Sequence, residues 1–289
     1  MNRARNGRRG AALLMVLWLL GLLTVVVGGF VLVSRTEALQ GRAARSGTQA
    51  RYAAEAGIDY AMARVQDPLV ERRWHADGRA YRLPFDGAEV EIRIVDESGK
   101  VDLNAADAEI LARLFMALEI DEDTARGLAG AILDWRDADD LLQPVGGAES
   151  AQYAAAGRPY GARNAPFDSV AELQLVLGMT PAFYRAAAPH LTVFSGLALP
   201  NPQFAQGPVL EALGLDPLQR EEILAAREAA DAVDPGLGVA AFGTGSYSIE
   251  STATLADGAT AHVSATVRAG GGPGGRIYVP LNWRLGEVF

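Results

Sequence analysis

Residues 11–33 read AALLMVLWLLGLLTVVVGGFVLV, and this stretch decides the fold because it carries no charge. As a helix, these 23 residues at ~1.5 Å each would span ~34 Å, more than the ~30 Å hydrocarbon core of a bilayer. A basic segment precedes the run and predicts a cytoplasmic amino terminus, with the rest of the chain exported. The arginines of that segment are Arg3, Arg5, Arg8 and Arg9.

Two kinds of cleavage compete as interpretations of this amino terminus. A secretory signal peptide has an apolar region of only ~7–15 residues and then a small-x-small site, whereas residues 34–47 continue in helix-compatible residues. The alternative is cleavage between Gly10 and Ala11, which would leave the apolar helix on the mature protein. A short basic leader that ends in glycine resembles the class III leader of type IV pilins and pseudopilins, and we favour this interpretation.

The predicted helix continues beyond the apolar run as far as Gln66, shortly before Pro68. Alanine and arginine dominate this part, and both favour helix formation. Apolar residues recur there at steps of three and four, which predicts one buried face against a soluble domain. The residues of this stripe are Ala50, Ala54, Ile58, Ala61 and Val65.

The composition narrows the classes of function. The chain has 289 residues, no cysteine and a formal net charge of −9, so disulfides and thiolate metal sites are excluded. Loss of the four leader arginines would bring the charge to −13 (−9 − 4). Such an acidic surface opposes nucleic acid, which binds basic faces, and favours cationic partners or divalent metal ions. Lys100 is the only lysine beside 25 arginines, a ratio that we attribute to genome composition.

Strand patterns occur at both ends of the soluble region and helical patterns lie between them. Residues 90–95 alternate in part, and residues 247–251 and 262–267 alternate at period two around the hairpin signal Asp257-Gly258. A further strand is expected at 276–279. The sequence therefore predicts an α+β, pilin-like fold, in which the long helix packs on one antiparallel sheet that is interrupted by an inserted all-α domain. The expected division is a leader at 1–10, a transmembrane and assembly helix at 11–66, sheet segments at 67–102 and 239–289, and the α-domain at 103–238.

Three segments of the middle share one pattern, a helix followed by a tight turn and a second helix. Gly178 and Gly214 suit helix C-termini, and Thr180 and Asp216 suit N-caps. The equivalent turn at 118–122, LEIDE, lacks the glycine. The pattern predicts helix-hairpin-helix-like repeats, a shape best known for gripping nucleic-acid phosphates. Acidic residues surround the first of these turns and no lysine is near, so we favour a packing role.

One cluster of acidic residues is a candidate metal-binding site. Carboxylates crowd the end of a predicted helix, where they face the negative end of its dipole and require a cation or solvent. Oxygen ligands in a flexible segment suit Ca²⁺, although the spacing is not that of an EF-hand. From the residues alone, a calcium site and a solvated acidic loop both stay open. The candidate ligands are Asp134, Asp137, Asp139, Asp140 and Glu149.

No enzymatic site is predicted. The three histidines lie far apart without ligand spacing, and no nucleophile elbow, phosphate loop or zinc motif is present in the sequence.

The chain resembles one family along nearly its whole length: the minor pseudopilin K of type II secretion systems. The segments that carry the resemblance are RGAALL at 9–14, YAAEAG at 52–57, DESGKVDLN at 96–104, DWRDAD at 134–139, GAE at 147–149 with Tyr153, FDSVAEL at 167–173 and GMT at 178–180.

The resemblance implies processing by the prepilin peptidase, with methylation of the new amino terminus. It further implies an inner-membrane protein with a periplasmic carboxy-terminal domain at the tip of a pseudopilus, in the company of minor pseudopilins I and J. Contact with secreted substrate proteins belongs to the same expectation, as does calcium binding in the α-domain.

One position distinguishes this chain from most pilins. Counted from Ala11, the fifth residue is Met15, where most pilins carry a glutamate thought to pair with a neighbour's amino terminus. A subunit with nothing above it has no amino terminus to neutralise, so an apolar residue suits a cap. Two rival functions are a minor pilin of a type IV pilus and a membrane-tethered helix-hairpin-helix DNA-binding protein.

Overall fold

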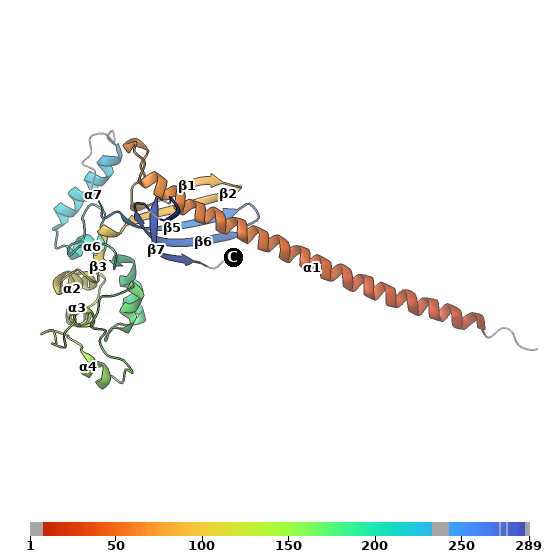
Figure 1. Ribbon diagram of the computed structural model, residues 1–289, viewed down its shortest axis with the longest axis horizontal. Coiled ribbons are helices and arrows are strands. Elements are labelled where there is room, and N and C mark those ends of the chain that lie inside the picture. The colour runs from red at the N-terminus through yellow and green to blue at the C-terminus, as the bar shows by residue number, and fades with distance from the viewer. Residues whose placement is uncertain (1–7, 233–242, 272, 276, 287–289) are drawn as a thin grey trace, which may run out of the picture.

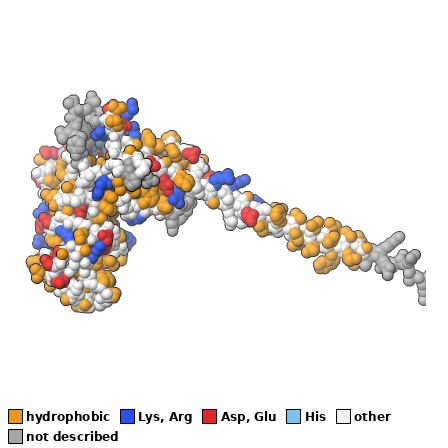
Figure 2. All heavy atoms as spheres, in the orientation of Figure 1, with side chains coloured by type: hydrophobic (Ala, Val, Ile, Leu, Met, Phe, Trp, Pro, Cys, Tyr) orange, Lys and Arg blue, Asp and Glu red, His pale blue; other side chains and the backbone are white. Residues whose placement is uncertain are grey.

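A single helix, α1 (Arg8–Val65), dominates the computed structural model, which describes residues 8–232, 243–271, 273–275 and 277–286. It runs unbroken through Gly28, Gly29 and Gly41, although glycines are weak points at which a helix could bend or unwind. Every large apolar side chain from Leu13 to Val33 is more than half exposed. Figure 2 shows this apolar half projecting from the rest of the molecule. Within the described residues, α1 is the one helix long and apolar enough to cross a membrane.

The other half of α1 packs on a five-stranded sheet in the order β1-β2-β5-β6-β7. All neighbouring strands are antiparallel, and the two segments of chain that form them lie on either side of the helical insertion, which confirms the prediction. The predicted strand at 276–279 is displaced, because β7 begins at Tyr278 and ends at Leu285, while Arg276 lies outside the described residues. The strands are β1 (Asp77–Phe85), β2 (Ala88–Asp96), β5 (Ser246–Leu255), β6 (Thr260–Ala269) and β7.

The core between helix and sheet follows from two periodicities. Alternate residues of β2 are buried, including Val90 and Ile92. They meet the predicted stripe of α1, whose alanines allow close approach of helix and sheet. A Cβ added to Gly57 would lie 2.2 Å from Ser251 Oγ on β5, so this glycine is required by the packing. The fully buried stripe residues are Ala50, Ala54, Ile58 and Ala61, and Val65 is partly buried at the end.

The inserted helices form a second core at the end of the sheet away from the apolar half of α1. Their core centres on aromatic and leucine side chains such as Phe115, Trp135 and Tyr153. The elements are α2 (Ala108–Ala117), α3 (Glu122–Arg136), α4 (Ser150–Ala155), η3 (Val170–Leu175), α5 (Pro181–Ala187), η4 (Ala188–His190), α6 (Gly207–Ala212) and α7 (Pro217–Ala232).

The first sheet segment, expected at 67–102, leaves the main sheet through a turn. The main sheet stops at Asp96, and a short 3₁₀ turn, η2 (Glu97–Gly99), leads into β3 (Val101–Asp102), which pairs in parallel with β4 (Leu191–Thr192). Asp96 Oδ1 accepts the Ser98 N–H at 2.8 Å and so caps η2. This capped turn leads the chain out of the main sheet.

The three turns with the shared pattern also share a backbone conformation. Glu119, Gly178 and Gly214 each adopt a positive φ, of 64°, 87° and 72°. An N-cap-competent residue follows two positions later and the next helix begins directly after it, as at Thr180, whose Oγ1 accepts the Phe183 N–H at 3.2 Å. Glu119 adopts this left-handed conformation although it is not a glycine, so the first turn has the same backbone shape as the other two. In the middle turn, the first helix is the 3₁₀ helix η3, so the repeats are uneven.

Candidate functional site

The acidic cluster starts on the last turn of α3 and ends just before α4. Asp134 is fully buried, and its Oδ1 accepts the Gln143 N–H at 3.1 Å. This hydrogen bond turns the segment after α3 back toward the helix. Glu149 is also buried and lies directly before α4.

Two carboxylates of the cluster carry oxygens without partners. Both carboxylate oxygens of Glu149, and Oδ1 of Asp137, are buried and accept no hydrogen bond from the described residues. Burial raises the pKa of Glu149, and the charges of Asp134 and Asp137 raise it further. Burial likewise raises the pKa of Asp134 and of Asp137. The structure thus holds three carboxyl groups near one another with too few donors.

The other two candidates are exposed. Asp139 Oδ1 accepts the Leu141 N–H at 2.8 Å, which closes a local turn. Asp140 Oδ1 accepts a hydrogen bond from Asn164 Nδ2 at 3.1 Å, across 24 residues. Asn164 was not foreseen as part of this cluster; its positive φ of 52° is the only local mark of its role.

The side chains of this cluster are chemically suited to bind a hard cation. All five candidates offer carboxylate oxygens, which Ca²⁺ prefers. The buried oxygens of Glu149 accept no hydrogen bond from the described residues, although its side chain faces Gln152 in a capping box at the start of α4. Across the described ranges, however, no three Asp, Glu, His or Cys side chains are already arranged as ligands of a metal ion. A cation would therefore draw these carboxylates together by side-chain rotation.

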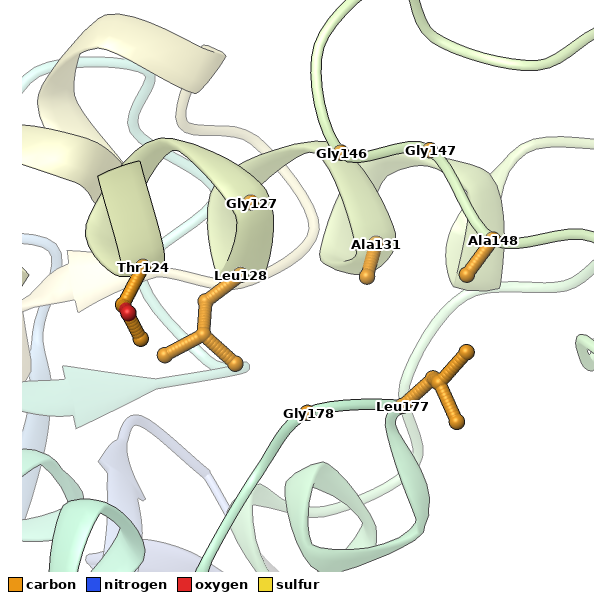
Figure 3. Close-up of a pocket in the computed structure, with 9 residues that line it drawn as sticks. All are labelled: Thr124, Gly127, Leu128, Ala131, Gly146, Gly147, Ala148, Leu177 and Gly178. Carbon is orange, nitrogen blue, oxygen red and sulfur yellow. The ribbon is translucent and has the colours of Figure 1, made fainter. Parts of the chain in front are cut away.

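A groove of about 260 Å³ adjoins the cluster. Figure 3 shows Leu128 and Ala131 of α3 pointing into it, with Leu177 and Gly178 on its other side. Gly146, Gly147 and Ala148 run along α3 at its border, immediately before Glu149.

The predicted cleavage residues Gly10 and Ala11 lie in the first turns of α1, and residues 1–7 of the leader lie outside the described residues. Met15 follows on the same helix and is 71% exposed.

The comparisons with known proteins agree on one family. A family model described as type II secretion system (T2SS), protein K, matches residues 92–196. The type II secretion system protein K of Pseudomonas aeruginosa is 30% identical over 252 residues, which cover 77% of this chain and 73% of that relative. The chain belongs to the type II secretion system protein K family.

Further matches agree with this membership. A protein K of Klebsiella pneumoniae is 29% identical over 205 residues, 64% of this chain and 62% of the relative. The fold is similar to that of a chain in the crystal structure of the GspK-GspI-GspJ complex from the type 2 secretion system of enterotoxigenic Escherichia coli. The TM-score is 0.59 at 18% identity, with 86% of this chain and 99% of that chain covered.

Membership in the protein K family confirms the role that the resemblance implied, a minor pseudopilin of a type II secretion system. Neither a type IV pilus minor pilin nor a tethered DNA-binding protein is favoured. The family is a structural one and is not known for enzymatic activity. One amino-terminal apolar helix in such a component fits a single-pass membrane anchor.

Proposed function

We propose that this protein K is the tip subunit of the pseudopilus and initiates and caps its assembly together with minor pseudopilins I and J. The observation that carries the proposal is the position of the inserted helices, at the end of the sheet away from the apolar half of α1 (Figure 1). A further subunit stacked on that end would meet this bulk. The solved complex of a similar chain with GspI and GspJ supports the choice of partners.

The proposed anchor is α1 in the inner membrane, with the sheet and inserted helices in the periplasm. Its large side chains from Leu13 to Val33 contact nothing else in the described chain, so bilayer or neighbouring helices would cover them. Met15 adds no charge to this surface, in keeping with a subunit that has no neighbour above it. In this proposal the prepilin peptidase cuts between Gly10 and Ala11 and methylates Ala11.

Intact mass of the protein from host membranes tests the processing. We expect a species that begins at Ala11 and carries one methyl group, and Gly10→Ala should leave the leader in place. A mass that starts at Met1 in the wild type would make this a plain signal-anchored protein. The tip role is tested separately, by co-purification of the full chain with I and J. A chain that stays alone while I and J still associate would refute it.

We also propose that the acidic cluster binds Ca²⁺, through Asp134, Asp137 and Glu149, with Asp139 and Asp140 nearby. The unpaired buried oxygens of Glu149 support the proposal, because a buried carboxylate without donors is costly unless a cation satisfies it. Calcium would supply charge neutralisation and tie the end of α3 to the start of α4. Calorimetric titration should show binding to wild type that Glu149→Gln abolishes. Asp123→Asn, in the exposed first turn of α3, is the matched control.

The proposal has no catalytic step and no nucleic-acid partner. The helix-hairpin-helix-like turns act in it as packing elements of the α-domain, and the first turn carries acidic side chains at Glu119, Asp121 and Glu122. Retention of DNA by the full chain at low salt would contradict this part. Contact with secreted substrate proteins, at the exposed end of the inserted helices, is a further part of the proposed role.

A further inference from the structure

The segment between the two halves of the acidic cluster lies directly on α3, backbone against backbone. A Cβ added to Gly130 of α3 would lie 2.0 Å from the carbonyl oxygen of Val145. A Cβ added to Gly146 would lie 2.2 Å from Cα of Gly127, and Gly146 has a φ of +71° that other residues rarely adopt. No side chain fits between helix and segment at these points.

The same contact encloses the carboxylate of Asp134. A Cβ added to Gly147 would lie 2.6 Å from Asp134 Oδ2 and 2.6 Å from the backbone nitrogen of Gln143. That nitrogen already donates to Asp134 Oδ1. Figure 3 shows the chain passing from Gly146 through Gly147 to Ala148 along α3, and Glu149 follows at once.

Glycine within a helix lowers stability relative to alanine, so Gly130 requires a reason beyond helix formation. Its place on α3 gives one, because Gly127, Gly130 and Asp134 follow one another at steps of three and four and so share a face. The face that carries the buried carboxylate is therefore also the face that admits the returning backbone.

We infer that this glycine contact is a positioning device, in which Gly130 holds residues 143–148 on α3 so that Glu149 faces Asp134 and Asp137 before a cation arrives. The inference rests on the proposed calcium binding. Closing the chain between the end of α3 and Glu149 costs conformational entropy. A contact that holds this segment on α3 without help from a cation removes that cost from the binding step, which raises affinity by preorganisation.

Two glycine-to-alanine variants on the same helix test the inference. Gly130→Ala must displace the backbone at Val145, whereas a Cβ at Gly127 meets nothing within 4 Å because it projects into open space. Both variants gain the same helix propensity. We expect Gly130→Ala to lower the calcium affinity of the full chain in detergent by at least about tenfold, and Gly127→Ala to change it less than about twofold.

A spectroscopic readout separates positioning from general destabilisation. With Tb³⁺ in place of Ca²⁺, luminescence lifetimes in H₂O and D₂O count the waters on the bound ion. Gly130→Ala should admit at least one additional water, since Glu149 would no longer face the helix carboxylates. A purely structural role would lower the melting temperature in EGTA and leave that count unchanged.

The outcomes are distinct. A wild-type chain that binds no Ca²⁺ would remove the proposed site, and this inference with it. Wild-type binding together with an unchanged affinity and water count in Gly130→Ala would overturn the inference alone. If Gly130→Ala fails to fold, hydrogen exchange of the wild type in EGTA decides. The Gln143 amide should be protected there, and exchange at the rate of an unstructured chain would overturn the inference.

Discussion

Lys100 Nζ lies 2.6 Å from Glu97 Oε1, at the place where the chain leaves the main sheet for the inserted helices. Glu97 is 2% exposed, and it also accepts hydrogen bonds from Ser248 of β5, at 2.5 Å, and from Thr192 of β4. One carboxylate therefore joins the sheet, the parallel strand pair and the single lysine of the chain. The orientation of the inserted helices on the sheet depends on this junction.

Removal of the positive charge of Lys100 from this junction should lower the stability of the fold. Lys100→Met leaves the charge of Glu97 buried without its partner, and we expect a loss of about 3–5 kcal/mol in the free energy of unfolding by urea. Arg113→Met is the control, because the Arg113–Glu109 pair is exposed and is worth at most about 1 kcal/mol. Equal losses in the two variants would contradict the assigned importance of the junction.

The acidic cluster should make stability depend on pH. The pKa values of Asp134, Asp137 and Glu149 are raised in the folded chain, so the folded state holds more protons than the unfolded state once pH rises above the ordinary carboxyl range near ~4. The contribution of these groups to the stability of the folded chain is therefore fully present below that range. It is lost as the pH rises through their pKa values in the folded state. In EGTA, Glu149→Gln should melt about 2 °C above wild type at pH 7.

Acid should reduce the difference in melting temperature between Glu149→Gln and the wild type, and calcium should reverse its sign. At pH 4 the gain from Glu149→Gln should shrink, because the wild-type carboxyl is then protonated as well. Saturating calcium at pH 7 should stabilise the wild type and leave Glu149→Gln unchanged. A variant whose melting temperature follows the wild type at both pH values would show that Glu149 ionises freely.

The packing of α1 on the sheet gives a third prediction. Gly57→Ala improves helix propensity by about 0.5–1 kcal/mol, but its Cβ collides with Ser251 Oγ and lies 3.0 Å from Val90 Cγ1. Overpacking of this kind costs about 1–3 kcal/mol, so the variant should be less stable overall.

A second substitution supplies the control for Gly57. Ser251 Oγ is buried without a hydrogen-bond partner among the described residues, so Ser251→Ala alone should be tolerated. Combined with Gly57→Ala, it should restore at least half of the lost stability, measured by thermal unfolding. If the stability losses of the two single variants simply add in the double variant, the contact with Ser251 Oγ is not the cause of the loss in Gly57→Ala.

Tyr153 supplies a prediction for the inserted helices. Its hydroxyl is fully buried and accepts the Leu177 N–H at 2.9 Å, and burial raises its pKa to about 12. Tyr153→Phe leaves that N–H without an acceptor and should cost about 1–3 kcal/mol. Burial raises the pKa of Tyr247 to about 12 as well, so in an absorbance titration the variant should lose one of the tyrosines that ionise near pH 12; loss of an earlier step would contradict the burial of Tyr153.

Patterns that are local in sequence predicted most of the fold. The stripe from Ala50 to Val65 and the alternation around Ile92 each follow from one period, and α1 extends as the absence of proline implies. The pairing of β3 with β4 was missed because it joins Val101 to Leu191, which are far apart in the sequence.

The remaining features of the site depend on contacts between distant parts of the chain. Gly130 and Gly146 are informative only because their backbones meet, and nothing near either residue in the sequence reveals that meeting. Asn164 reaches Asp140 across 24 residues for the same reason. Lys100 was attributed to genome composition, yet its position in the junction is specific; counting a residue type says nothing about where it packs.

The continuity of α1 also fixes how the periplasmic part would move. Residues 35–45 are exposed, and the first side-chain contacts with the rest of the chain come at Ser46 and Gln49. These 11 residues form a bare spacer of about 16 Å at 1.5 Å per residue. Because no break separates spacer and span, the helix is a stiff lever. A span tilted by about 20° would swing the far end of α1, about 47 Å beyond Ser34, sideways by about 16 Å. The tilt of the helix within the bilayer therefore determines how far the periplasmic part is displaced sideways.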